Sequence, residues 1–207
     1  AGAMGTSLGV LLDEMSLDFV SHDAQHVAAM NESGALIEGA FTKCVKVRAK
    51  LPSQMEGRYD VILLAVKQRD NHAAAAFLQP YLKEDGAIVT IQNGLPERGL
   101  AQVFGKDRVY GCTLSWSAEK TAPGIVQVTS DTGFHLALGA YGKGDKLDAI
   151  AALLSHAGEL NVGNLAEIRF AKLAINASFS TLSALSGLTF YTIAKNIKSS
   201  LWYSCKR

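Results

Sequence analysis

The 207-residue sequence is poor in cysteine and lacks any cysteine spacing that would define a structural class. Its three cysteines, Cys44, Cys112 and Cys205, lie far apart and form no CxxC or Cys/His motif. This pattern argues against a disulfide framework, suggests no zinc or other metal site, and is typical of a protein from the reducing cytoplasm.

Long hydrophobic runs are also missing. No run is longer than residues 61–66, which have the length of a buried strand, whereas a helix that crosses a bilayer needs roughly 20 apolar residues. The N-terminus has no basic segment followed by an apolar core, so we expect neither a membrane span nor a secretion signal. Nor does one sign of charge dominate, since 20 Lys and Arg against 19 Asp and Glu give a formal net charge of +1. That balance provides no field to attract nucleic acid or an anionic membrane.

What the sequence contains is a regular change between helical and strand patterns. Apolar residues at helical spacing predict a helix over residues 5–15, and a short strand over 17–20 follows. Residues 26–32 predict a second helix that ends at Gly34, and residues 35–47 alternate enough to predict a hairpin at the edge of the sheet.

The clearest strand comes next. Residues 61–66 are continuously apolar, which predicts a parallel strand covered on both faces, and residues 71–82 and 87–91 predict the following helix and strand. Strands that alternate with helices specify an α/β fold with a doubly wound parallel sheet of the Rossmann type. Such sheets bind ligands at the carboxyl ends of their strands.

The pattern changes after residue 108. Three segments are more typical of antiparallel strands that extend the sheet, over residues 109–113, 124–129 and 134–139. A helix over about 146–157 closes this domain, and a longer helix over 166–184 ends at Gly187, which is placed as a C-terminal cap. We therefore place a domain boundary near residue 164, between residues 1–164 and residues 165–207.

Two segments near the N-terminus are candidates for binding a dinucleotide. The opening Ala1-Gly2-Ala3-Met4-Gly5 is similar to the tail of a GxGxxG fingerprint, although a simple helix-entry turn explains two glycines equally well. Ser21 and His22 follow the predicted strand 17–20, which corresponds to the second strand of a dinucleotide-binding fold. At the end of that strand NAD enzymes have an acidic residue that binds the ribose hydroxyls. Because neither residue is a carboxylate, this position leaves room for a 2′-phosphate that could bind His22, although Asp23 is adjacent. The alternative is an exposed turn histidine without a ligand.

Two more candidates follow the next strands. Lys67 directly follows the predicted strand 61–66, so its ammonium group is expected at the carboxyl edge, where it could attract a phosphate or carboxylate. Asn93 and Gly94 end the strand after it and offer an amide and a close backbone approach. The alternatives are a solvated lysine and an ordinary Asn-Gly turn.

The last helix carries the sharpest feature, a row of three polar side chains. Lys172, Asn176 and Ser180 lie at i, i+4 and i+8, on one side of an otherwise apolar helix. A buried amide or ammonium group without a partner costs several kcal/mol, so such a row must find partners. The alternative is the solvated stripe of an amphipathic helix.

Taken together, these segments resemble the ketopantoate reductase (2-dehydropantoate 2-reductase) family over residues 1 to about 190. The resemblance depends on the order and spacing of the motifs, namely Ala1-Gly2-Ala3-Met4-Gly5, His26-Val27-Ala28-Ala29-Met30-Asn31 with Gly34, Ala65-Val66-Lys67, Gln92-Asn93-Gly94, Pro123-Gly124 and Lys172-Leu173-Ala174-Ile175-Asn176. The opening strand and its glycine are missing, and residues 191–207, with Lys198, Trp202 and Cys205, depart from the family.

The resemblance implies a cytoplasmic NADPH-dependent oxidoreductase that reduces ketopantoate to pantoate for pantothenate biosynthesis. It implies a cofactor-binding domain over residues 1–164 and the first part of a helical substrate domain over residues 165–207, and it leaves a homodimer possible. It assigns the cofactor to Gly2, Met4, Gly5, Ser21, His22, Lys67 and Asn93. Lys172 is the implied catalytic residue, and Asn176, Ser180 and Asn93 the substrate-binding ones. Ser180 stands where the family often has a second asparagine. A reductase of another 2-oxo acid and a nucleotide-binding fragment without turnover are the alternatives.

Overall fold

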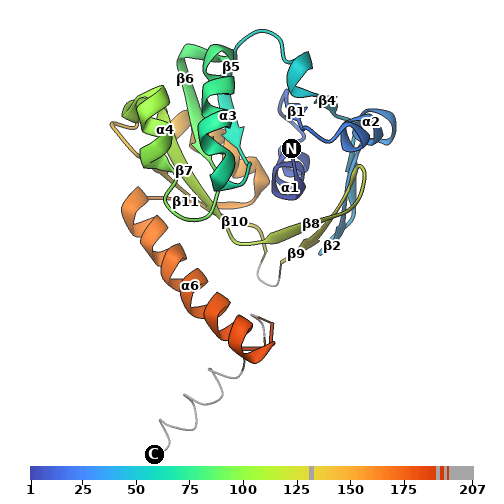
Figure 1. Ribbon diagram of the computed structural model, residues 1–207, viewed down its shortest axis with the longest axis vertical. Coiled ribbons are helices and arrows are strands. Elements are labelled where there is room, and N and C mark those ends of the chain that lie inside the picture. Colours follow the sequence, from blue (N-terminus) through green and yellow to red (C-terminus); the bar gives the residue numbers. More distant parts are fainter. Residues whose placement is uncertain (131–132, 190–191, 194, 196–207) are drawn as a thin grey trace, which may run out of the picture. The chain divides into compact units, whose positions relative to one another are not determined.

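The computed structural model describes residues 1–130, 133–189, 192, 193 and 195 (Figure 1). The chain divides into a compact unit over Ala1–Ile168 and a second unit that begins at Arg169. The functional division expected after residue 164 stays a prediction. Lys198, Trp202 and Cys205 lie outside the described residues. Within the described part of the chain, no helix is both long and apolar enough to cross a bilayer.

The first unit is built on a five-stranded sheet of order β11-β10-β7-β6-β5. Its strands are β5 (Tyr59–Leu64), β6 (Leu82–Thr90), β7 (Val109–Leu114), β10 (His135–Ala140) and β11 (Glu159–Val162). β5, β6 and β7 are parallel, and β10 joins β7 in antiparallel orientation. Strands β1 (Asp18–Val20) and β4 (Arg48–Lys50) form a separate parallel pair. The predicted α/β fold of the Rossmann type is confirmed.

Helices alternate with these strands as a doubly wound sheet requires. On one face lie α3 (Asn71–Leu78) and α4 (Glu97–Phe104), which pack over β5, β6 and β7 (Figure 1). The larger core contains residues of α1 (Ala3–Leu11), α2 (Ala24–Ser33) and α5 (Leu147–Leu154). α3 is shorter than the predicted helix 71–82, because a 3₁₀ turn with Pro80 follows it and β6 already begins at Leu82. α4 was not predicted.

A second sheet of order β3-β2-β9-β8 packs against α1. Its strands are β2 (Ala35–Gly39), β3 (Lys43–Val45), β8 (Ser117–Ala122) and β9 (Ile125–Thr129). The predicted hairpin over residues 35–47 is confirmed as β2 and β3, but it belongs to this second sheet. The prediction that residues 124–129 extend the main sheet was wrong, because β9 pairs with β2 and β8. Strand β7 is likewise parallel to β6, not antiparallel.

Glycines allow α1 to pack closely on two strands. A Cβ atom at Gly5 would lie 3.2 Å from the Cβ of Ala65, just beyond β5, and one at Gly9 would overlap the ring of Phe19 on β1. The third glycine of a dinucleotide fingerprint has this role of close helix–strand packing. These two glycines therefore allow α1 to lie close to the carboxyl edge of β5.

Buried His26 joins α1, α2 and the turn between β8 and β9. Its Nε2 lies 3.1 Å from the Thr6 hydroxyl, and the Gly124 amide donates to its Nδ1 at 2.9 Å. Because Nδ1 accepts, Nε2 carries the proton. Burial lowers the pKa of His26, which keeps the ring neutral.

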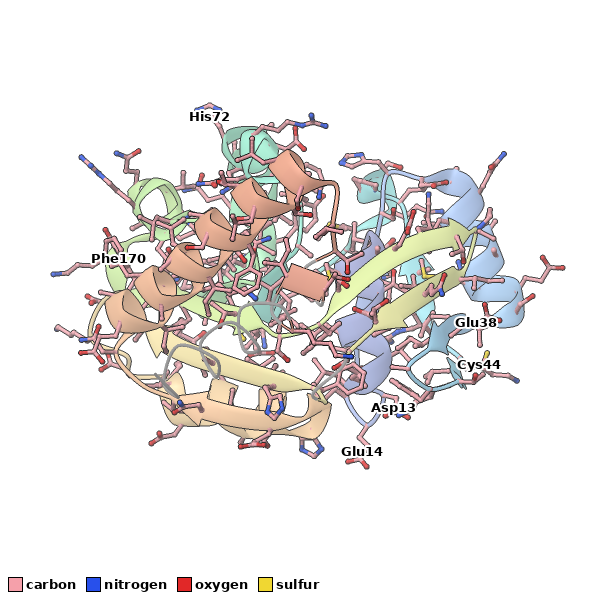
Figure 2. All side chains as sticks on the ribbon, turned by 90° about the horizontal axis from the view of Figure 1, so that it is seen from below. Asp13, Glu14, Glu38, Cys44, His72 and Phe170 are labelled. Atoms are coloured by element: carbon pink, nitrogen blue, oxygen red, sulfur yellow. The ribbon has the colours of Figure 1, made fainter. Side chains whose placement is uncertain are left out.

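The last helix, α6 (Leu165–Ser186), begins where the Asn164 side chain accepts hydrogen bonds from the amides of Ala166 and Glu167 at 2.9 and 3.2 Å. It ends at Gly187, whose φ of +69° confirms the predicted C-terminal glycine cap. Several of its large apolar side chains are exposed, among them Phe170, labelled in Figure 2.

Candidate functional site

The loops after β5 and β6 lie side by side at the carboxyl edge of the sheet. Leu64 and Thr90 are register partners, and the Ile91 amide donates to the Leu64 carbonyl at 3.1 Å. β5 ends at Leu64, two residues before the predicted end at residue 66, yet Lys67 still lies beyond the strand and is exposed. Asn93 occupies the equivalent position beyond β6 and is exposed as well. The structure thus brings Lys67 and Asn93 to one edge, as predicted.

Buried Gln92 holds these two loops together. Its side-chain amide donates to the Val66 carbonyl at 2.5 Å and to Asn71 Oδ1 at 2.6 Å, and its Oε1 accepts from the Thr90 hydroxyl at 2.9 Å. A buried amide whose atoms are all engaged fixes the loops that carry it. In the sequence Gln92 stood out only as part of the Gln92-Asn93-Gly94 motif, and no local signal indicated that its side chain would cross to the neighbouring loop.

The glycine turn at the start of α1 lies at the same edge. Gly5 packs against Ala65, two residues before Lys67. Gly2 is the N-cap of α1, with φ −94° and ψ −162°, and receives no side-chain cap from the described residues. A Cβ at Gly2 would meet no atom of the described chain within 4 Å.

This geometry provides the test of whether a dinucleotide fits. Neither packing nor backbone conformation requires glycine at position 2, whereas a pyrophosphate that approaches the backbone does. The first turn of α1 also contains no acidic residue. Its amides and the helix dipole therefore suit an anion. Met4 is half-buried and packs against the core, so its part in binding would be limited to the backbone.

The loop after β1 completes the edge. The Ala1 nitrogen donates to the Val20 carbonyl, which places the glycine turn beside this loop. Ser21 is half-buried, His22 is exposed, and Asp23 caps α2 by accepting from the His26 amide at 3.0 Å. Asp23 Oδ2 also accepts from Lys120 of β8. Lys120 was missed by sequence reasoning, because 97 positions separate it from Asp23.

The polar row belongs to the second unit and is described on α6 alone. Lys172 and Asn176 are half-buried, whereas Ser180 is exposed. Burial lowers the pKa of Lys172. Several of the apolar residues around the row are exposed, namely Leu173, Ile175, Leu182 and Leu185. On α6, therefore, Lys172 and Asn176 are less exposed than several of the apolar side chains.

Comparison with known proteins identifies relatives of this chain. Residues 1–142 match the family model described as ketopantoate reductase PanE/ApbA. A 2-dehydropantoate 2-reductase from Mesorhizobium japonicum is 28% identical over 221 residues, covering 93% of this chain and 67% of the relative. One from Nostoc sp. is 26% identical over 202 residues, covering 89% of this chain and 61% of the relative.

Solved structures show the same fold. The 2-dehydropantoate 2-reductase of Geobacter metallireducens matches with a TM-score of 0.80 at 26% identity, over 89% of this chain and 63% of that one. A D-mandelate dehydrogenase bound to NADH and anilino(oxo)acetate matches with a TM-score of 0.78 at 22% identity, over 88% of this chain and 61% of that one. The chain thus spans 61–67% of the length of these relatives.

Proposed function

This chain belongs to the ketopantoate reductase PanE/ApbA family, and from that premise we propose that it acts in the NADPH-dependent reduction of 2-dehydropantoate (ketopantoate) to pantoate. The observation that carries the proposal is the carboxyl edge of the sheet, where a glycine turn with open space beside it lies next to Lys67 and Asn93. The implied setting is pantothenate biosynthesis in the cytoplasm, and the implied partner is a small 2-oxo acid.

The residues of this edge suit the binding of a dinucleotide. The amides at the start of α1 hold the pyrophosphate, and Gly2 lets it approach the backbone. Lys67 supplies a positive charge for a phosphate or carboxylate, and Asn93 supplies hydrogen bonds to cofactor and substrate. Gln92 keeps both loops in place before the ligand arrives, which reduces the ordering cost of binding.

The residues of α6 suit the chemistry. When bound, NADPH supplies the hydride that reduces the 2-oxo carbon. Lys172 donates a proton to the carbonyl oxygen and stabilises the negative charge that develops there. Asn176 and Ser180 hydrogen-bond the substrate and hold it in a reactive orientation. The lowered pKa of Lys172 makes its proton easier to transfer near neutral pH.

The test is ketopantoate-dependent loss of the nicotinamide absorbance. We expect the Lys172→Ala variant to lose on the order of 10²–10⁴-fold in kcat, the usual contribution of a positioned acid, and to retain NADPH binding by calorimetry. Lys106→Ala, at an exposed lysine in a 3₁₀ turn, is the matched control. Equal rates for the Lys172 variant and the control would refute the assigned role.

A second candidate is a related reductase for another 2-oxo acid. Ser180 favours it, because a serine offers fewer hydrogen bonds than the asparagine often found there in the family. A panel of 2-oxo acids tested with the same chain distinguishes the two, since the preferred substrate has the highest kcat/KM. Dinucleotide binding without reduction of any of them would instead support a fragment that only binds nucleotide.

A further inference from the structure

The loop that follows β1 contains one carboxylate, Asp23, and both of its oxygens are already engaged. Oδ1 accepts from the His26 amide at 3.0 Å as the N-cap of α2, and Oδ2 accepts from the Lys120 ammonium group. An acidic residue about 20 positions after the glycine turn normally binds the ribose hydroxyls of NAD. For Asp23 to do so, at least one of its oxygens would have to leave its present partner.

The charge of this loop is therefore set by a residue from another sheet. Lys120 and Asp23 are 39% and 37% exposed in their side chains, so both can be reached by a ligand from solvent. Lys50, the nearest lysine in the adjoining strand β4, is already paired with Asp18 at 2.9 Å. His22 is exposed. Lys120 is thus the charge that balances Asp23.

We infer that Lys120 determines coenzyme preference: by holding and neutralising Asp23, it allows the ribose loop to accept a 2′-phosphate. This inference rests on the proposed function, since it concerns the same dinucleotide site. Without Lys120, an uncompensated carboxylate would repel a dianionic phosphate, and its Oδ2 would be free to bind a ribose hydroxyl while Oδ1 still caps α2. Lys120 acts here as a positioning residue, because it works through Asp23.

The experiment measures the dissociation constants of NADPH and NADH for the full chain by calorimetry. In Lys120→Met we expect the preference for NADPH over NADH to fall on the order of tenfold or more, with NADH binding kept or strengthened. Asp23→Asn retains a good N-cap and removes the charge, so NADPH binding should not weaken. The double variant should recover most of the lost preference, because the effect of Lys120 passes through the charge of Asp23.

Lys83→Met is the matched control. Lys83 forms an exposed ion pair with Asp60 at 2.8 Å, between the starts of β6 and β5 at the opposite edge of the sheet. Its removal should leave the ratio of the two dissociation constants unchanged.

Several outcomes would overturn the inference. If Lys120→Met weakened both coenzymes equally, the lysine would have a structural role only. If the double variant behaved like Lys120→Met, the effect would not pass through Asp23. In both cases the proposed function would stand, because dinucleotide binding itself would have been measured. Failure of the wild-type chain to bind either coenzyme would refute the proposed function and this inference together.

Discussion

Replacing His26 is expected to destabilise the first unit more than any exposed substitution. The side chain is fully buried, and its two nitrogens join Thr6 on α1 to the Gly124 amide in the turn between β8 and β9. Both partners are themselves buried. In His26→Ala, therefore, a hydroxyl and a backbone amide lose their hydrogen bonds in a place that water does not reach.

The expected magnitude follows from these contacts. Each buried polar group left without a partner costs about 1–3 kcal/mol, and the space vacated by the ring adds a cavity term. His26→Ala should therefore lower the free energy of unfolding by about 3–5 kcal/mol, a large share of the roughly 5–15 kcal/mol of a typical domain. His26→Asn keeps an acceptor for the Gly124 amide and should lose about half as much.

The pKa of His26 adds a pH dependence with a definite sign. Burial, helped by the charge of Lys120, lowers this pKa below the ordinary 6.5, while Asp23 opposes the shift. Between the two pKa values the unfolded chain binds a proton that the folded chain does not, so stability falls as pH falls. The contribution is complete above about pH 6.5 and declines below it by up to about 1.4 kcal/mol per pH unit.

Urea unfolding followed by far-ultraviolet circular dichroism, at about pH 7.5 and 5.5 on either side of the unfolded pKa, measures both effects. Amide exchange at Gly124 reports the contact directly. His72→Ala is the control, because His72 is exposed and projects away from α3 (Figure 2). A loss below about 1 kcal/mol in His26→Ala, or an equal pH response in wild type and His26→Asn, would refute the reasoning.

Four further predictions concern Gly9, Gly2, Gln92 and Lys172. Gly9→Ala should cost about 1–3 kcal/mol by circular dichroism because its Cβ would overlap the ring of Phe19; Gly2→Ala has room for its Cβ and should weaken NADPH binding in calorimetry with little loss of stability. Gln92→Leu removes hydrogen bonds to two half-buried loop partners, so unfolding and calorimetry should show about 1–3 kcal/mol less stability and weaker NADPH binding. The lowered pKa of Lys172 predicts that the reduction rate falls as pH rises through a value below 10.5, and that Lys172→Arg removes this limb of the pH profile.

Features fixed by a few neighbouring residues were predictable from the sequence. Gly34 and Gly187 end α2 and α6 because both adopt positive φ, of 89° and 69°. The hairpin of β2 and β3 followed from alternation within one segment. Lys67 and Asn93 were placed at one edge because parallel strands share the direction of their carboxyl ends. In each case the physical cause lies within the segment or in a rule of sheet geometry.

Features that depend on distant partners were not predictable. The apolar run of β5 was expected to be covered on both faces, yet β5 is the last strand of its sheet, and only Leu64 of the strand is fully buried. β9 has the pattern of an extending strand, but its pairing with β2 places it in the other sheet. On α6 the sequence indicated a polar row on an otherwise apolar helix, but it did not show that large apolar side chains would be exposed, such as Leu185 at 81%. Periodicity shows that a face exists but not which partner covers it.

The contact that stabilises the first unit also positions the residue to which we assign coenzyme preference. The Gly124 amide that donates to His26 lies in the turn that begins β9, and Lys120 lies four residues earlier on β8, paired with Val126. Asp23 caps the helix that carries His26. Loss of the imidazole should therefore release the turn and separate Lys120 from Asp23. In a folded His26→Ala variant, the preference for NADPH should fall in the same direction as in Lys120→Met, and an unchanged preference would show that β8 is held in register without this histidine.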